Sequence, residues 1–194
     1  MIMKINILNL TIDSLGFIMS KNERHEVSAG ILVYRIVDNE IQVLLGKNGG
    51  PRWKNKSIGA WNIPKGHVED GENIFDTAIR EFMEETSLNL NIESYEDVIY
   101  LDSSKTKSGK TVHIWALEYD YVPNEYKVEI SSNMVETEWP PKSGTIIEVP
   151  ELSEAYYFKM NVAKRMIFPY QKCFLEKLEV ELKDKLSGKI NEEI

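Results

Sequence analysis

The sequence predicts an α/β (α+β) fold in which a mixed β-sheet lies between helices. Extended segments rich in Val, Ile, Leu and Tyr occur both before and after one strongly amphipathic central helix, and a second helical pattern closes the chain. Strands that flank a helix in this way favour layers in which helices cover the faces of one sheet. With 194 residues, of which 42% are hydrophobic, the chain is long enough for one domain and short for two.

We expect this single domain to cover residues 27–187. Residues 1–26 form an N-terminal extension of doubtful role. The apolar run in residues 1–18 is interrupted by polar side chains, is too short for a membrane span and lacks the features of a signal peptide, so we expect it to be dispensable. Residues 188–194 are expected to be a frayed tail.

Two strands begin the domain, over residues 27–37 and 41–46, and the polar residues 38–40 between them are a hairpin signal. Residues 47–60 contain Gly, Pro and four basic side chains and therefore predict a loop. A short strand over residues 61–65 then leads into the central segment.

A second strand pair follows the central helix. The two strands are predicted over residues 95–103 and 110–122, with a turn at 105–109. Residues 131–143 begin extended and end in a loop that contains two prolines. Residues 155–160 predict a last short strand.

The closing helix is predicted over about residues 168–187. One stripe of this helix collects its apolar side chains, which are Phe174, Leu175, Leu178 and Leu182. Cys173 is the only cysteine of the chain, so an internal disulfide is excluded and a reducing cytoplasm is indicated. Its position in a helical pattern indicates packing rather than catalysis.

Residues 66–88 carry the chemistry. The apolar side chains that recur there at helical spacing are Ile74, Phe75, Ala78, Ile79, Phe82 and Met83. Glu81, Glu84 and Glu85 fall on a different face, where neighbouring like charges cost a few tenths of a kcal/mol per pair. Such a triplet is either a solvated acidic face or a site for a hard divalent cation. Gly66, whose carbonyl can approach a metal, favours the cation site.

This segment resembles the signature of the Nudix hydrolases. The positions that fall on the signature are Gly66, Glu72, Arg80, Glu81, Phe82, Glu84, Glu85 and Leu88. Phe82 is aromatic where an aliphatic residue is usual, and Ser87 stands where a glycine is usual for a left-handed helix C-cap. At Ser87 we expect altered local geometry and not loss of the metal site. The resemblance implies the α/β/α sandwich of that family.

By this resemblance, Glu81 and Glu85 are the first expected ligands of Mg²⁺ or Mn²⁺. Glu84 follows them, and Gly66 contributes its backbone carbonyl. A divalent ion neutralises phosphate charge, orients the phosphate and lowers the pKa of bound water. Arg80 is expected to hold a ligand carboxylate by a bidentate pair, with an ordinary helix salt bridge as the alternative.

The general base of the family is either a carboxylate of the signature or a glutamate on a later loop. Glu84 and Glu85 represent the first possibility. Glu136 and Glu138 represent the second, because alternation places them on one side of an extended chain. We favour Glu138, which Trp139 and the following prolines would hold in place; two exposed strand-end acids are the alternative.

Substrate contacts are predicted from the flanks of the signature. Lys65 directly precedes the signature glycine, and Arg52 lies with other cations in a loop that either meets phosphates or is solvated. Aromatic rings can stack a base, and we expect one or two of them to do so here. The substrate-binding set that we predict is Lys65, Arg52, Trp61 and Tyr157.

Charge limits the partners. A net charge of −8 argues against a basic nucleic-acid surface, and the chain has no membrane span. The stretch at residues 61–72 is similar to the diadenosine-tetraphosphate hydrolase branch. This similarity implies metal-dependent hydrolysis of a nucleoside diphosphate linked to another moiety, with dinucleoside polyphosphates favoured. A nucleoside triphosphate pyrophosphohydrolase and a non-catalytic nucleotide-sensing module are the alternatives. We expect a cytoplasmic monomer or homodimer.

Overall fold

The computed structural model describes residues 27–192 with the exception of 91 and 93–96, and side chains as far as residue 183. The expected N-terminal extension, residues 1–26, lies outside the described residues. None of the described helices combines the length and the apolar composition that crossing a membrane requires.

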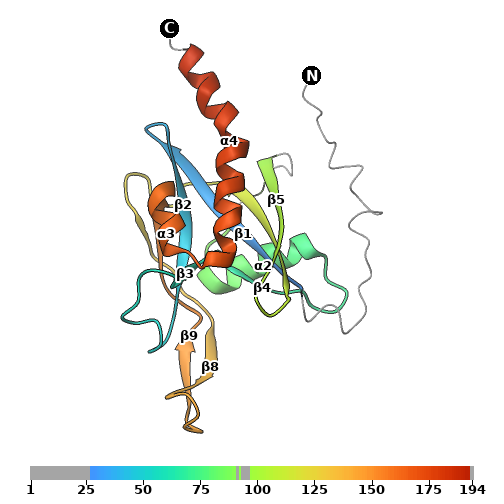
Figure 1. Ribbon diagram of the computed structural model, residues 1–194, viewed down its shortest axis with the longest axis vertical. Coiled ribbons are helices and arrows are strands. Elements are labelled where there is room, and N and C mark those ends of the chain that lie inside the picture. Colours follow the sequence, from blue (N-terminus) through green and yellow to red (C-terminus); the bar gives the residue numbers. More distant parts are fainter. Residues whose placement is uncertain (1–26, 91, 93–96, 193–194) are drawn as a thin grey trace.

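A mixed sheet forms the centre of the domain (Figure 1). Its main path runs, in order, through β5 (Val98–Lys105), β6 (Thr111–Glu118), β1 (Val27–Val37), β2 (Glu40–Asn48), β10 (Leu152–Lys159) and β7 (Lys127–Val128). The β1–β6 pair is parallel, and the other pairs are antiparallel. Two short strands join the sheet at its side, with β3 (Trp61–Asn62) on β2 and β4 (Lys65–His67) on β1.

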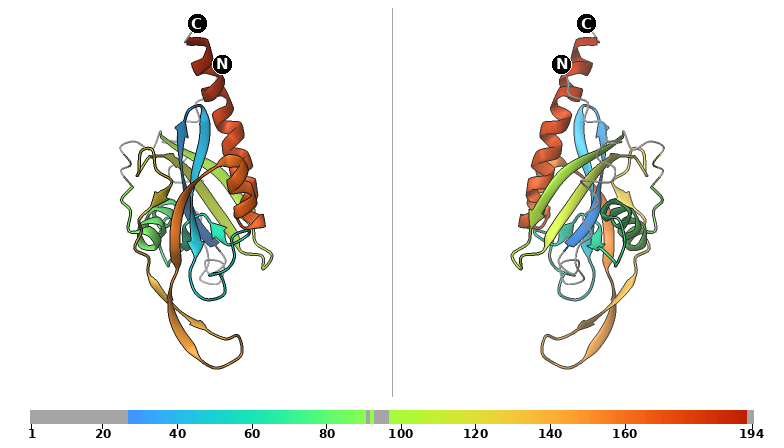
Figure 2. Two further views of the ribbon diagram at one scale, coloured as in Figure 1. Left: turned by 90° about the vertical axis from the view of Figure 1, so that its left-hand side faces the viewer. Right: turned by 90° about the vertical axis from the view of Figure 1, so that its right-hand side faces the viewer.

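Helices cover both faces of this sheet, as the two views of Figure 2 show. Helix α2 (Ile74–Thr86) packs on one face, and α3 (Met160–Met166) and α4 (Lys172–Glu192) pack on the other. Successive side chains of a strand point to opposite faces, so Ile31 of β1 faces α2 whereas Leu32 enters the core beneath α4. The predicted mixed sheet between helices is therefore confirmed.

The first strands match their predictions closely. Strand β1 has the predicted bounds, and Asp38 and Asn39 adopt positive φ values of 50° and 59° in the hairpin turn. Positive φ at both central residues is typical of the tight turns that match the twist of the flanking strands. The predicted strand over 61–65 is wrong as one element, because residues 61–62 pair with β2 while 65–67 pair with β1.

The elements that follow α2 differ more from the predicted ones. Beyond the predicted elements the structure adds β7, β9 (Ile146–Pro150) and α3, which the sequence did not predict. Strand β9 pairs with β8 (Met134–Glu138) in a hairpin that projects from the domain (Figure 1). The closing helix begins at Lys172, after a 3-10 turn at Pro169–Gln171, and continues to Glu192, so most of the expected tail is helical backbone.

Local capping fixes the ends of α2. The Asn73 Oδ1 atom accepts hydrogen bonds from the backbone N–H groups of Phe75 at 2.8 Å and Asp76 at 3.4 Å. At the other end Ser87 adopts the left-handed conformation (φ 56°) and donates its N–H to Met83 O at 2.7 Å. Its hydroxyl donates to Ser131 O at 2.6 Å. The expected altered geometry at Ser87 is therefore wrong, because the serine ends the helix in the way that a glycine does.

We predict that Asn73→Ala lowers the free energy of unfolding by about 1 kcal/mol, because the first turn of α2 loses the acceptor for two of its backbone N–H groups. Chemical unfolding of the metal-free protein measures this loss. Asn73→Asp keeps an acceptor at the same position and is expected to stay within a few tenths of a kcal/mol of the parent. Equal losses in the two variants would contradict a capping role.

Candidate active site

Glu81 and Glu85 of α2 lie against the short strand β4. Glu85 is only 2% exposed, and its Oε2 accepts a hydrogen bond from the backbone N–H of Lys65 at 3.2 Å. Gly66 faces Glu81 so closely that a Cβ on the glycine would lie 2.0 Å from the Glu81 carboxylate. Because β4 pairs with β1 and α2 packs on β1, only a residue without a side chain fits here.

Arg80 links the acidic side chains of this region. Its Nε and Nη2 donate to the two Glu72 oxygens at 2.8 and 2.9 Å, which is a bidentate pair. Its Nη1 donates to Glu81 at 2.9 Å and to Glu84 at 3.1 Å, and Nη2 also reaches the His67 carbonyl at 3.0 Å. Arg80 therefore fixes the directions of three carboxylates, with Glu72 as the bidentate partner.

Glu72 is held as a carboxylate. The hydrogen bonds from Arg80, together with one from the Thr77 hydroxyl at 2.7 Å, lower the pKa of Glu72 to about 2. Thr77 is fully buried, so its hydroxyl has a fixed direction. Glu72, which orients Arg80, is therefore itself oriented by Thr77 of α2.

Burial acts in the opposite direction on the neighbouring carboxylates. It raises the pKa of Glu85 well above the ordinary value, and the charges of Glu151 and Glu81 raise it further, while Lys65 opposes the shift. Burial is also the main cause of the raised pKa of Glu81. Carboxylates held in this way are stabilised in their charged form by a nearby cation.

Glu151, which the sequence did not single out, lies with the acidic side chains of α2. We call these four side chains the carboxylate cluster: Glu81, Glu84, Glu85 and Glu151. It directly precedes β10, and burial raises its pKa, with Lys65 opposing and Glu84 adding to the rise. Its backbone is fixed, because its carbonyl accepts from Gly49 N–H at 3.0 Å and its N–H donates to Asn133 O at 2.8 Å. No local pattern marks this position, because only the pairing of β10 with β2 brings it to α2.

The donor set fits a hard divalent ion in its chemistry, since carboxylate and carbonyl oxygens are the ligands that Mg²⁺ and Mn²⁺ prefer. Within the described part of the chain, however, no three acidic, histidine or cysteine side chains converge around one point. Glu81 and Glu84 are turned toward Arg80 Nη1 instead.

Two predicted substrate contacts, Tyr157 and Trp61, lie in the core. Tyr157 is 1% exposed, donates its hydroxyl to Tyr119 O at 2.7 Å and has the Arg35 guanidinium 4.1 Å from its ring centre. Trp61 is 5% exposed and packs edge-on against Phe158, with ring centres 4.7 Å apart. Both side chains support the sheet and have no face free for a base.

The structure places the predicted base Glu138 away from α2. It lies in the projecting hairpin, where its Oε1 accepts the Gly144 N–H at 2.7 Å. Met134 pairs with Pro150, next to Glu151, and Glu138 lies four strand positions further out, roughly 13 Å away at the rise of a strand. Glu136 lies on the same exposed hairpin. The later carboxylate near α2 is Glu151.

The two predicted basic contacts differ in setting. Lys65 is half-buried, and its charge acts on both Glu85 and Glu151, so it lies at the carboxylate cluster. Arg52 is exposed in the loop between β2 and β3, with its guanidinium carbon 5.2 Å from the centre of the Trp53 ring. The structure thus brings Lys65 to the glutamates and keeps Arg52 on the adjacent loop.

A mixed sheet between helices, with a glutamate-rich helix packed against a glycine-containing strand, defines the class of α/β/α sandwich proteins. The model of the NUDIX domain family matches residues 24–175 of the chain. The chain therefore belongs to the NUDIX domain family and is a Nudix hydrolase.

Named relatives agree with this assignment. The RNA pyrophosphohydrolase of Sulfurovum sp. (strain NBC37-1) is 32% identical over 113 residues, which cover 56% of this chain and 71% of the relative. The asymmetrical bis(5'-nucleosyl)-tetraphosphatase of Caenorhabditis elegans is 33% identical over 88 residues, which cover 43% of this chain and 59% of the relative, less than two thirds of its length.

Solved structures agree on the fold. The binary complex of the C. elegans Ap4A hydrolase superposes with a TM-score of 0.54 at 21% identity, over 81% of this chain and 98% of that one. The NUDIX domain of Shewanella oneidensis NrtR, in its complex with ADP ribose, has a TM-score of 0.53 at 12% identity. At these identities the likeness concerns the fold alone.

Proposed function

We propose that this enzyme hydrolyses a phosphoanhydride bond in a nucleoside diphosphate linked to another moiety, with dinucleoside polyphosphates as the preferred class. The observation that carries the proposal is that Gly66 lies against the Glu81 carboxylate while the backbone N–H of Lys65 donates to the buried Glu85. Buried like charges are costly unless a cation compensates them. The named tetraphosphatase relative supports the substrate class.

Mg²⁺ or Mn²⁺ is the proposed cofactor. Glu81, Glu84 and Glu85, together with the Gly66 carbonyl, are the groups that would hold the ion. When bound, the ion neutralises phosphate charge and makes an attacking water more acidic. The chain itself positions the ligands, because Glu72 fixes Arg80 and Arg80 fixes Glu81 and Glu84.

Glu151 is the proposed general base, in place of Glu138. Burial raises its pKa, which makes it a stronger proton acceptor than an exposed glutamate. Hydrogen bonds to Gly49 and Asn133 hold the Glu151 backbone in place, so the position from which its side chain extends is fixed. Glu84, which is exposed at the same cluster, is the alternative base.

We predict that Glu151→Gln lowers kcat by about 10²- to 10⁴-fold, the usual contribution of a positioned base. The amide keeps the size of the side chain and cannot accept the proton, so the melting temperature is expected to change little. Steady-state kinetics on the best substrate measures the effect. Glu154→Gln is the matched control, because Glu154 lies on the same strand and pairs with Lys47 at 3.0 Å. A parental kcat in Glu151→Gln would transfer the role to Glu84.

The function is tested with a panel of nucleotides in the presence of Mg²⁺, Mn²⁺ or a chelator. The panel contains dinucleoside polyphosphates, nucleoside triphosphates, nucleotide sugars and a 5'-triphosphorylated oligoribonucleotide, the last because of the Sulfurovum relative. Ion-dependent cleavage of dinucleoside polyphosphates with the highest kcat/KM is the expected result. Preference for triphosphates would support the second candidate, a triphosphate pyrophosphohydrolase. Tight binding without cleavage would favour a sensing module.

A small nucleotide is the proposed substrate, in the cytoplasm, and the enzyme is proposed to act as a monomer or homodimer without a nucleic-acid or membrane partner. The single cysteine supports the cytoplasmic location, and the net charge of −8 supports the absence of a nucleic-acid partner.

A further inference from the structure

The sequence separates its charges around the site. The chain has 31 acidic residues, yet none occurs between Glu40 and Glu69. The basic side chains of this interval are Lys47, Arg52, Lys54, Lys56 and Lys65. Lys47 pairs with Glu154, and Lys65 lies at the carboxylate cluster. Three cations therefore remain on the loop between β2 and β3, residues 49–60.

Trp53 organises two of these cations. The Arg52 guanidinium carbon and the Lys56 Nζ each lie 5.2 Å from the centre of the Trp53 ring, which is within cation–π range. The ring itself is fixed, because it packs edge-on against Phe168 at 5.4 Å with an interplanar angle of 87°. The backbone turns tightly around it, with Trp53 N–H donating to Gly50 O at 3.1 Å.

The charged groups of Arg52 and Lys56 are exposed, and among the described residues they make no hydrogen bond and no ion pair. Contact with a ring face occupies neither the planar N–H donors of a guanidinium nor the three donors of an ammonium. The loop therefore presents two positioned cations whose donors are free for an anion.

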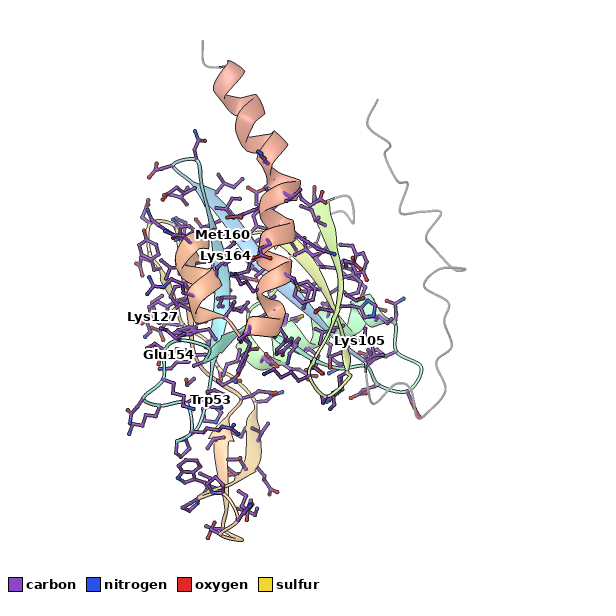
Figure 3. The ribbon with its side chains drawn as sticks, viewed as in Figure 1. Trp53, Lys105, Lys127, Glu154, Met160 and Lys164 are labelled. Atoms are coloured by element: carbon purple, nitrogen blue, oxygen red, sulfur yellow. The ribbon has the colours of Figure 1, made fainter. Side chains whose placement is uncertain are left out.

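This loop is anchored to the carboxylate cluster. Gly49 donates its N–H to the carbonyl of Glu151 at 3.0 Å, and a Cβ on Gly49 would lie 1.8 Å from the Pro150 carbonyl. At its far end, Gly59 N–H donates to Met166 O at 2.9 Å. Figure 3 shows Trp53 at the end of the domain from which the β8–β9 hairpin projects. The cations thus lie on a loop that is fixed at both ends, and its first residue is hydrogen-bonded to the backbone of Glu151.

We propose that Trp53, Arg52 and Lys56 form a second anion site, which takes the phosphates beyond the bond that is cleaved. Trp53 is a positioning residue: it holds the two cations in a fixed arrangement and has no contact with the reacting atoms. Such a site favours substrates with a chain of three or more phosphates over those with two, because both phosphates of a diphosphate flank the cleaved bond and none remains for the cations. This inference rests on the proposed function.

The experiment compares P1,P4-di(adenosine) tetraphosphate with P1,P2-di(adenosine) diphosphate, which share their nucleosides and differ in chain length. Trp53→Leu is expected to raise KM for the tetraphosphate by about tenfold, to leave kcat unchanged and to alter KM for the diphosphate less than twofold. Trp53→Phe keeps a ring for the cations and is expected to retain most of the parental KM. Equal KM increases for both substrates in Trp53→Leu would overturn the proposal.

Two further double variants leave the Trp53 packing intact, so a misfolded loop cannot explain their results. Arg52→Gln with Lys56→Gln leaves Trp53 in its packing and is expected to reproduce the tetraphosphate-specific KM increase. Lys105→Gln with Lys107→Gln removes the same charge from the exposed β5–β6 turn and is expected to change neither KM. If the two double variants behave alike, the effect is one of overall charge and the proposal is wrong.

Calorimetric titration with inorganic tripolyphosphate separates this proposal from the proposed function. The parent protein in chelator is expected to bind tripolyphosphate about tenfold more tightly than Arg52→Gln with Lys56→Gln. Absence of hydrolysis with this difference intact would contradict the proposed function alone. Hydrolysis without any difference in tripolyphosphate affinity would contradict the anion site alone.

Discussion

Glu85→Gln is expected to lower kcat by about three orders of magnitude while the fold stays intact. Glu85 is the most buried of the proposed ion ligands, and glutamine keeps its shape but removes the negative charge. A bound divalent ion lowers the activation free energy by several kcal/mol, and each 1.36 kcal/mol corresponds to a tenfold change in rate. Steady-state rates at saturating Mg²⁺, together with circular dichroism, measure both parts of the expectation.

The matched control is Asp76→Asn, an exposed acid on the same helix. It removes one negative charge outside the cluster and is expected to retain the parental kcat. A drop of similar size in both variants would indicate that the charge of α2 as a whole matters, and Glu85 would lose its special role. Parental activity in Glu85→Gln would exclude it as a ligand.

In the absence of the ion, Glu85→Gln is expected to weaken the dependence of stability on pH. The pKa of Glu85 is higher in the folded protein than in the unfolded chain, so the folded state binds this proton more tightly. This contribution to stability is fully present below the unfolded pKa of about 4.3 and is lost as pH rises through the folded pKa. With a chelator, Tm of the parent is expected to fall from pH 5 to pH 8, and to fall less in Glu85→Gln. Parallel curves would contradict this.

Gly66→Ala is expected to have the second-largest effect, on stability and activity together. The new methyl group would lie 2.0 Å from the Glu81 carboxylate, far inside van der Waals contact, so either β4 or Glu81 must move. Overpacking of this kind typically costs about 1–3 kcal/mol. Displacement of Glu81 also breaks its hydrogen bond from Arg80, so kcat is expected to fall by at least about 10²-fold. Chemical unfolding and kinetics measure the two effects.

A double variant identifies the cause. Adding Glu81→Ala to Gly66→Ala removes the carboxylate that the methyl group meets, so most of the lost stability is expected to return while activity stays low. Two sites in direct contact couple in this way, whereas distant sites add. If the two losses of stability simply added, the clash would lie elsewhere, and the close approach of Gly66 to Glu81 would not explain the need for glycine.

Local signals in the sequence predicted the elements whose causes are local. Helix α2 has its apolar spacing, its Asn73 cap and its end at Ser87 within one short stretch, so its position was predictable. The hairpin between β1 and β2 is predictable for the same reason, since Asp38 and Asn39 tolerate positive φ. The left-handed conformation of Ser87 was not predicted, because its hydroxyl reaches the Ser131 carbonyl only in the folded chain.

Contacts between distant segments decided the placements that the sequence did not predict. Trp61 and Tyr157 are aromatic residues that could stack a base, but their burial depends on which face of the sheet each one meets. Glu138 and Glu151 are both acidic residues of the later chain. The register of β8 on β9 carries the first away from α2, and the pairing of β10 with β2 brings the second to it.

Spacing along one helix and one turn is a local property, so the fold class, the acidic helix, the glycine before it and hence the hydrolase family are predictable from the amino-acid sequence. Long-range packing brings Glu151 to the glutamates, pairs Arg80 with Glu72 and places two cations against the Trp53 ring. These contacts depend on strand register. A strand shifted by one residue exchanges its two faces, and no local pattern states which partner a strand will meet.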